Sequence, residues 1–243
     1  MKNVLVTGGA GGIGSCIVKE LLDKEYKPII LDIDLKNIEE MKEKYSVLDV
    51  WNLDTTNVIR LQEFRDKLSD EFCLDHIICL AGRALEDEWK EFEKQDIIHI
   101  QKSIELNLIG HINIIHTFLP ILKKSKAKSK SITLISSINA FGDFGLPAYS
   151  SSKSGIYGLV KSLCSELGKE RIRINAISPG TIVTPATELE PKNFDNLLKG
   201  TAIGEFATKE EIAKTVRFII ETNGITGQNI IVDAGQSTVL KKK

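Results

Sequence analysis

Short apolar runs, rich in β-branched residues, alternate along the chain with longer stretches whose apolar positions recur at helical spacing. The apolar runs lie at residues 3–8, 28–32, 46–54, 74–82, 131–137, 171–180 and 228–235. Because they are apolar almost throughout, each predicts a strand of a parallel sheet that is covered on both faces. Right-handed crossovers between such strands produce a doubly wound α/β sandwich of three layers, with about seven parallel strands.

Helical periodicity is clearest in three of the intervening stretches. Residues 17–24 place Ile17, Leu21 and Leu22 on one face, and residues 96–122 and 148–168 form longer apolar patterns. The sequence contains no linker rich in proline, glycine or serine and no internal repeat. We therefore expect residues 1–243 to form a single domain.

Two polar segments interrupt this pattern. Residues 123–130 carry five lysines, which predict a solvated loop before the fifth strand because the aromatic partners of a nucleic-acid site are missing. Residues 184–206 are polar, contain two prolines and show weak periodicity. Since this segment follows the sixth strand, we expect it to form a lid over a bound substrate.

Composition narrows the class of protein. Of the 243 residues, 42% are hydrophobic and 27% are charged, as is typical of a soluble globular protein. The net charge of −1 gives no general attraction to nucleic acid or to an acidic membrane. We expect a cytoplasmic protein without a signal peptide, membrane span or metal site. The scattered cysteines, expected to be reduced thiols, are Cys16, Cys73, Cys79 and Cys164.

Residues 7–14 read TGGAGGIG and lie between the first predicted strand and the first helix. Glycine loses more conformational freedom on folding than other residues, so this cluster requires a physical reason. The N-terminus of a helix presents unpaired N–H groups, and the missing side chains would let a pyrophosphate approach them. Asp32 ends the second strand, where its carboxylate can accept hydrogen bonds from ribose hydroxyls. The sequence thus predicts a dinucleotide site.

Asp32 also predicts which dinucleotide is bound. NADP carries a phosphate where NAD has the ribose 2′-hydroxyl, and two charges about 4 Å apart repel by roughly 4 kcal/mol at an effective dielectric near 20. No arginine or lysine occurs in residues 7–18 or directly after Asp32, where Ile33 and Asp34 follow. We therefore expect NAD rather than NADP.

Residues 149–153 read YSSSK, so Tyr149 and Lys153 share one face of the predicted helix. Ser136 and Ser137 stand at the end of the fifth predicted strand. Ligands of open α/β sheets bind at the carboxyl ends of strands. The pattern therefore brings serine, tyrosine and lysine to the edge where the glycine-rich turn would hold a cofactor.

Together these motifs resemble the short-chain dehydrogenase/reductase family. TGGAGGIG matches the family's TGxxxGxG turn, and YSSSK matches its YxxxK motif. NLIG (107–110), the Asp54-Thr55 pair, RINAISPG (173–180) and TGQNIIVDAG (226–235) follow in the family's order. The resemblance spans nearly the whole chain and implies a Rossmann fold, a dinucleotide cofactor and oxidoreductase activity on a secondary alcohol or its ketone.

The resemblance also implies a role for each matching residue. It makes Tyr149 the general acid/base, Lys153 its partner, Ser137 the group that polarises the substrate carbonyl, and Asn107 the holder of a proton-relay water. It places the cofactor contacts at Gly8, Gly11, Gly12, Ile13, Gly14, Asp32, Asp54, Thr55, Ala81, Gly82, Tyr149, Lys153, Pro179, Gly180, Ile182 and Thr184.

These residue types suit the chemistry. A phenol has a pKa near 10 and must lose about three units, or about 4 kcal/mol, to act as a base at neutral pH. We expect the Lys153 ammonium and a positive nicotinamide ring to lower the pKa of Tyr149 in this way. The phenol would then exchange a proton with the substrate oxygen while hydride moves to or from the cofactor. Ser137 would donate a hydrogen bond to that oxygen.

The sequence departs from the family pattern at three places. CLAG (79–82) replaces NNAG, and Cys79 cannot supply the amide hydrogen bonds of an asparagine. Ser136 would restore the commoner spacing to Tyr149, although the second serine of such a strand end is the usual catalytic one, which favours Ser137. DAG (233–235) replaces the commoner DGG.

Several functional alternatives stay open at this point. A 3-oxoacyl thioester reductase fits the resemblance, but such enzymes usually prefer NADPH, which Asp32 disfavours. The intact catalytic residues argue against a non-catalytic dinucleotide-binding sensor, and a dehydratase or epimerase would show no net change of cofactor. A sugar, polyol, hydroxy acid or steroid-like alcohol would each fit as the substrate. The family implies a homotetramer or homodimer.

Overall fold

The computed structural model describes residues 1–45, 48–142, 145–184 and 191–239, and within them seven parallel strands form one sheet in the order β3-β2-β1-β4-β5-β6-β7. This order confirms the predicted doubly wound α/β fold. The strands are β1 (Asn3–Thr7), β2 (Lys27–Asp32), β3 (Asp49–Asn52), β4 (His76–Cys79), β5 (Lys130–Ile135), β6 (Ile172–Pro179) and β7 (Asn229–Val232).

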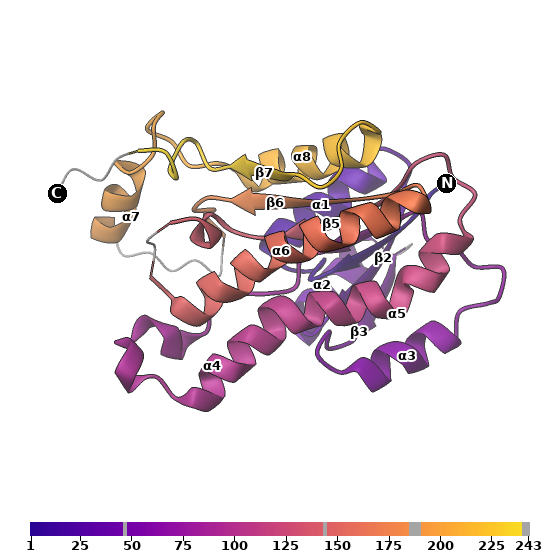
Figure 1. Cartoon of the computed structure of the whole chain (residues 1–243), viewed down its shortest axis with the longest axis horizontal. Helices are drawn as coiled ribbons and strands as arrows, with labels where there is room; N and C mark the ends of the chain where they lie inside the picture. Colours follow the sequence, from indigo (N-terminus) through magenta and orange to yellow (C-terminus); the bar gives the residue numbers. More distant parts are fainter. Residues whose placement is uncertain (46–47, 143–144, 185–190, 240–243) are drawn as a thin grey trace.

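Helices connect the strands and cover both faces of the sheet (Figure 1). They are α1 (Gly12–Leu22), α2 (Leu35–Lys44), α3 (Val58–Asp66), α4 (Ile97–Ile104), α5 (Gly110–Lys124), α6 (Pro147–Lys169), α7 (Pro191–Leu198) and α8 (Lys209–Glu221). Shorter turns of helix are η1 (Glu86–Trp89), η2 (Phe92–Lys94), η3 (Glu105–Ile109) and η4 (Ile138–Ala140).

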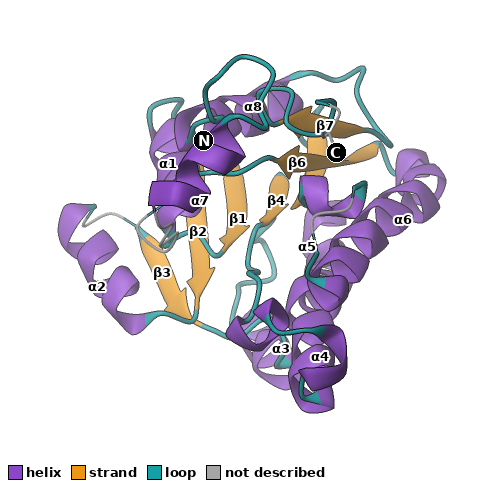
Figure 2. Cartoon of the chain, turned by 90° about the vertical axis from the view of Figure 1, so that its left-hand side faces the viewer, coloured by secondary structure: helices purple, strands orange, loops and turns teal. Residues whose placement is uncertain are grey.

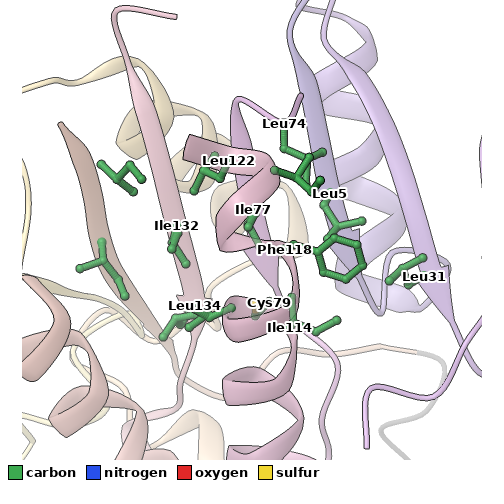
Figure 3. Packing of buried hydrophobic residues seen from close by; sticks show 14 of the residues in the cluster. Leu5, Leu31, Leu74, Ile77, Cys79, Ile114, Phe118, Leu122, Ile132 and Leu134 are labelled. Carbon is green, nitrogen blue, oxygen red and sulfur yellow. The ribbon is translucent and has the colours of Figure 1, made fainter. Parts of the chain in front are cut away.

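Two apolar cores lie on opposite faces of the sheet because successive strand residues point to opposite sides. Leu5 of β1 belongs to the core beneath α3, α5 and α6, whereas Val4 and Val6 belong to the core beneath α1, α2 and α8. Figure 2 shows these two layers of helices on either side of the strands. In Figure 3, Phe118 of α5 points toward Leu5. Burial on both faces explains why the strands read as continuous apolar runs.

The stretch Ile97–Lys124 is one long helix, interrupted by a single π-helical turn at η3. In the described part of the chain it is the one helix long and apolar enough to cross a membrane, with a mean hydropathy of 1.2 over 18 residues. It is a core helix, because Ile114, Phe118 and Leu122 are buried against the sheet.

Two polar segments differ from expectation in detail. The lysine-rich segment is only partly a solvated loop, since Lys123 and Lys124 end α5 and Lys130 begins β5 with its side chain buried. Part of the expected lid, residues 185–190, lies outside the described residues. The next part forms α7, a helix that the weak periodicity of this segment did not predict.

The topology places the ends of the central strands together. The strand order reverses between β1 and β4, and Thr7 lies beside both Leu31 of β2 and Cys79 of β4. Ligands of such sheets bind at the carboxyl ends of strands near this switch point. In Figure 1 the arrows of β6 and β7 point toward the side where α7 lies. The glycine-rich turn, the ends of β4 to β6 and the start of α6 therefore share one edge.

Candidate active site

The glycine-rich turn folds so tightly that side chains are excluded from it. Gly8 has a φ of +68°, and a Cβ added there would lie 3.0 Å from the Ala81 backbone. A Cβ on Gly14 would lie 2.1 Å from the carbonyl oxygen of Gly8. Gly11 caps α1 without a side-chain hydrogen bond. The first N–H groups of α1, at Gly12 and the residues after it, therefore have no side-chain acceptor over them and suit an anionic ligand.

Asp32 lies at the end of β2 beside this turn. One carboxylate oxygen accepts a 2.9 Å hydrogen bond from the backbone N–H of Ala10, and the other accepts a 3.1 Å bond from that of Asp34. The side chain is buried. The acid is thus held against the turn, where a ribose would follow the pyrophosphate of a bound dinucleotide.

The end of β4 is tied to β1 by backbone groups. The N–H groups of Leu80 and Ala81 both donate to the Thr7 hydroxyl, at 3.1 and 3.2 Å. His111 of α5 donates to the carbonyl of Cys79. This bond joins α5 to β4 at the position where the family pattern has an asparagine, so a side chain from another element makes a link that Cys79 itself cannot make.

Two further predicted cofactor positions lie in the turn after β3. The carboxylate of Asp54 accepts hydrogen bonds of 2.8 Å from both the backbone N–H and the hydroxyl of Thr56. Thr55 is buried, and its carbonyl accepts a 3.1 Å bond from Asn113 of α5. The turn after β3 is therefore fixed to the long central helix.

The predicted contacts at residues 179–184 follow β6. A Cβ on Gly180 would lie 2.7 Å from the Cβ of Asp233, so this backbone packs closely on the turn after β7. The N–H of Thr181 donates to the Gln236 side chain at 2.9 Å, and Ile182 is buried. The DAG motif thus supports this stretch. Pro179 ends β6, and Thr184 is the last residue described before the gap.

Tyr149 and Lys153 come together one turn apart on α6. The Lys153 Nζ lies 5.5 Å from the centre of the Tyr149 ring and donates a 3.0 Å hydrogen bond to the carbonyl of Ile135. The Ser137 hydroxyl, at the end of β5, makes a hydrogen bond to Tyr149 that lowers the pKa of the phenol. The structure therefore brings the predicted serine, tyrosine and lysine to one place.

Burial moves the pKa values of this pair in opposite directions. Burial and, to a smaller extent, the negative charge of Glu88 raise the pKa of Tyr149 to about 12. Burial also lowers the pKa of Lys153 to about 7. Within the protein alone, loss of solvation disfavours the charged phenolate. The lowering of the Tyr149 pKa by Lys153 together with a positive nicotinamide ring stays a prediction.

The two serines at the end of β5 have different partners. The Ser136 hydroxyl donates to the Lys153 backbone carbonyl at 2.8 Å. The Ser137 hydroxyl lies 3.0 Å from the side-chain oxygen of Asn139 and close to Tyr149. Ser136 therefore holds α6 against β5, whereas Ser137 is the serine that faces the phenol.

Asn107 lies in the π-helical turn η3, and such turns are frequent at functional sites. Its amide nitrogen donates to the carbonyls of Arg83 and Ser103, at 2.9 and 3.0 Å. Its buried Oδ1 has no hydrogen-bond partner among the described residues. A Cβ on Gly82 would lie 2.6 Å from this oxygen and 3.2 Å from the Lys153 Nζ. The lack of a side chain at Gly82 therefore lets the Asn107 oxygen and the Lys153 Nζ approach this backbone closely.

These features fit a dinucleotide. The turn offers backbone N–H groups for phosphates, Asp32 offers a carboxylate for ribose hydroxyls, and Asn107 and Lys153 beside Gly82 offer one acceptor and one cation. The sequence did not single out Glu88, Asn139 or the link made by His111. Glu88 is buried and contacts the start of α6, but in the sequence it is one of several acids in a polar stretch.

Comparison with known proteins adds relatives over the full length. Residues 8–237 match a family model described as Enoyl-(Acyl carrier protein) reductase. The 3-oxoacyl-(acyl-carrier-protein) reductase FabG of Rickettsia prowazekii is 31% identical over 243 residues, covering 98% of each chain. Carbonyl reductase family member 4 of Xenopus laevis is 28% identical over 235 residues, covering 96% of this chain and 97% of that protein.

Solved structures share the fold. ElxO with NADP bound is 26% identical, with a TM-score of 0.87, and covers 98% of this chain and 99% of that chain. A 3-oxoacyl-(acyl-carrier protein) reductase from Brucella melitensis, solved with bound NAD, is 24% identical, with a TM-score of 0.86, and covers 98% of this chain and 92% of that chain. Each of the two nicotinamide dinucleotides is therefore found in a protein of this fold.

Proposed function

Because this chain belongs to the short-chain dehydrogenase/reductase family, whose members are NAD(P)-dependent and act on carbonyl or CH–OH groups, we propose that it interconverts a secondary alcohol and its ketone with NAD. The observation that carries the proposal is the convergence of Ser137, Tyr149 and Lys153 near the backbone of Gly82. This arrangement supplies a proton donor, a hydrogen-bond donor and a cation at the place where the fold binds ligands.

The cofactor would be held from end to end by this chain. Gly8, Gly11, Gly12, Ile13 and Gly14 would bind the pyrophosphate, and Asp32 would bind the adenosine ribose. Asp54 and Thr55 would face the adenine, with Ala81 and Gly82 along its ribose. Lys153 would hold the nicotinamide ribose. The nicotinamide end would contact the stretch that contains Pro179, Gly180, Ile182 and Thr184.

The bound nicotinamide would supply or accept the hydride. The protonated phenol of Tyr149 would donate its proton to the ketone oxygen, or the phenolate would accept the proton of the alcohol. Ser137 would donate a hydrogen bond to the same oxygen after its hydroxyl turns away from Asn139. Asn107 would hold the water that carries the proton onward from Lys153.

Asp32 supports NAD over NADP. Its carboxylate is fixed against the turn by Ala10, and the residues that follow it, Ile33 and Asp34, provide no cation for a 2′-phosphate. A second candidate function is the reduction of a 3-oxoacyl thioester, which is favoured by the similarity to FabG over 98% of the chain. The two candidates differ in the group attached to the ketone, so thioesters belong in the substrate screen.

The whole chain would act as one cytoplasmic domain, with residues 184–206 as a lid over the substrate. Ala202 of this segment donates to the Ala234 carbonyl at 2.9 Å, so its end is anchored beside the site. A homotetramer or homodimer would cover the exposed apolar side chains of the long helices, among them Ile98, Ile109, Ile112 and Tyr157.

The decisive experiment is a screen of alcohols, ketones and 3-oxoacyl thioesters with each of the four cofactor forms. Absorbance of the reduced nicotinamide would report hydride transfer, and chromatography of the products would detect a dehydratase or epimerase that leaves the cofactor unchanged. We expect turnover of a secondary alcohol or ketone that is faster with NADH than with NADPH. Binding of NADH without turnover of any compound would favour the sensor instead.

A further inference from the structure

Glu88 is a buried acid that the proposed reaction does not use. It lies in η1, its residue is 3% exposed, and both of its carboxylate oxygens accept hydrogen bonds. One oxygen accepts from the backbone N–H of Tyr149 at 2.7 Å. The other accepts from the Ser103 hydroxyl at 2.6 Å and from the N–H of Leu85 at 3.2 Å. Three donors therefore surround this one carboxylate.

These bonds join the two helices that carry the reacting groups. The N–H of Tyr149 belongs to the first turn of α6, whose cap residue Leu146 is left-handed at φ +55° and makes no side-chain cap. Glu88 supplies the missing acceptor from 61 residues away. Ser103 lies one turn before Asn107, which donates to the Ser103 carbonyl. A continuous set of hydrogen bonds thus connects Tyr149 to Asn107 through Glu88.

Glu88 also places a negative charge near the phenol. The groups that act on Tyr149 are Glu88 from η1, the Ser137 hydroxyl from the end of β5 and Lys153 from α6. His111 of α5 lies near Lys153, but burial lowers its pKa to about 3 and keeps it neutral. Since a neighbouring anion disfavours the phenolate, Glu88 acts against Lys153.

We propose that Glu88 is a positioning residue for the reaction inferred above: its carboxylate fixes Tyr149 relative to the Asn107 helix and places a negative charge near the phenol. This inference rests on the proposed function, because positioning matters only if Tyr149 exchanges a proton with a substrate. A residue that served only to cap α6 could be a local side chain at the helix start, as Asp34 is for α2 and Thr208 for α8. A buried carboxylate near the phenol carries a desolvation penalty that a local cap avoids.

The test compares Glu88→Gln with Glu86→Gln, which removes an exposed acid from the same turn of helix. The first measurement is the phenolate absorbance of each protein during a pH titration, with Tyr149→Phe in each background to isolate the signal of Tyr149. We expect Glu88→Gln to lower the pKa of Tyr149 by roughly half a unit or more, and Glu86→Gln to leave it within that margin. Equal shifts, or no shift, would overturn the electrostatic part of the proposal.

The positioning part is tested by Ser103→Ala, which removes one bond to Glu88 without a change of charge. We expect kcat to fall at least threefold, with KM for NAD and the pH profile unchanged. Glu88→Asp keeps the charge and shortens the reach, so it should keep the pH profile and lose kcat in the same way. An unchanged kcat in both variants would overturn the positioning role. Because neither variant removes the charge of Glu88, both can still be measured if Glu88→Gln does not fold.

The titration does not depend on activity. A lowered Tyr149 pKa in Glu88→Gln together with no turnover of any alcohol or ketone by the unsubstituted protein would refute the proposed function and leave the charge effect of Glu88 standing. Normal turnover with an unshifted Tyr149 pKa would refute the charge effect of Glu88 and leave the proposed function standing.

Discussion

The ammonium group of Lys153 lies 5.5 Å from the centre of the Tyr149 ring, one helical turn away on α6. Burial acts on the two groups in opposite directions, raising the pKa of Tyr149 to about 12 and lowering that of Lys153 to about 7. At neutral pH the phenol therefore holds its proton, as a general acid for ketone reduction must. Alcohol oxidation additionally requires a positive charge nearby, which an oxidised nicotinamide would provide when bound.

Replacement of Tyr149 by phenylalanine should abolish turnover and leave binding of NADH intact. The hydroxyl is the proposed proton donor, and such donors contribute about 10²- to 10⁴-fold to the rate. The matched control is Tyr157→Phe, a second tyrosine on α6 whose ring is partly exposed. Turnover by absorbance and NADH binding by fluorescence titration would be measured on both. Full activity in Tyr149→Phe would remove this residue from the mechanism.

Replacement of Asp32 by asparagine should shift the cofactor preference toward NADPH. The substitution keeps the size of the side chain and removes the charge that would repel a 2′-phosphate, so the ratio of kcat/KM for NADPH over NADH should rise about tenfold or more. Asp34→Asn removes an equal charge two residues away and keeps a good helix cap. A ratio that changes equally in both variants would contradict direct repulsion by Asp32.

The sequence predicted the sheet because its central strands β1, β2, β4, β5 and β6 are buried on both faces. Continuous apolar runs such as NVLVT and KPIILD are typical of parallel strands that are covered by helices on both faces. The glycine-rich turn and the Tyr149–Lys153 pair were predictable for a related reason. Both depend on local spacing, which is a property of one strand–turn–helix unit or of one helix face.

Contacts between segments that are distant in the sequence could not be predicted from sequence patterns. Glu88 meets Tyr149 across 61 residues, and His111 meets Cys79 across the interface of α5 and β4. The raised pKa of Tyr149 could not be predicted either, because it depends on how completely the folded chain removes water from the phenol. The choice between Ser136 and Ser137 likewise needed the position of the Lys153 carbonyl.

Two glycine-to-alanine substitutions within helices should have opposite effects. A Cβ on Gly14 would lie 2.1 Å from the Gly8 carbonyl oxygen, so Gly14→Ala should distort the turn, lower the melting temperature and weaken NADH binding. Gly158 lies in α6 with no atom within 4 Å of an added Cβ, so Gly158→Ala should stabilise the fold by about 0.5–1 kcal/mol. Urea unfolding of both variants checks this, and destabilisation by Gly158→Ala would contradict it.

Replacement of Lys153 by methionine should stabilise the fold at low pH and lose this advantage as the pH rises. Burial lowers the pKa of Lys153 from 10.5 to about 7. Between these two pH values, the unfolded chain therefore binds a proton at Lys153 that the folded chain has lost. The stability of the unsubstituted protein must therefore increase with pH between about 7 and 10.5, and the full penalty applies below pH 7. Methionine has a similar length and carries no charge, so Lys153→Met removes the penalty and with it the pH dependence.

At pH 6, the free energy of unfolding of Lys153→Met should exceed that of the unsubstituted protein by a few kcal/mol. This gain is reduced by roughly 1 kcal/mol because the substitution removes the hydrogen bond to the Ile135 carbonyl. Lys161→Met is the control, since Lys161 is exposed on the same helix. Urea unfolding at pH 6, 8 and 9.5 would measure the free energy of unfolding of all three proteins. Parallel pH curves for Lys153→Met and the unsubstituted protein would show that Lys153 keeps an ordinary pKa in the fold. In that case, Lys153 would be protonated at neutral pH, as a cation placed to stabilise the phenolate must be.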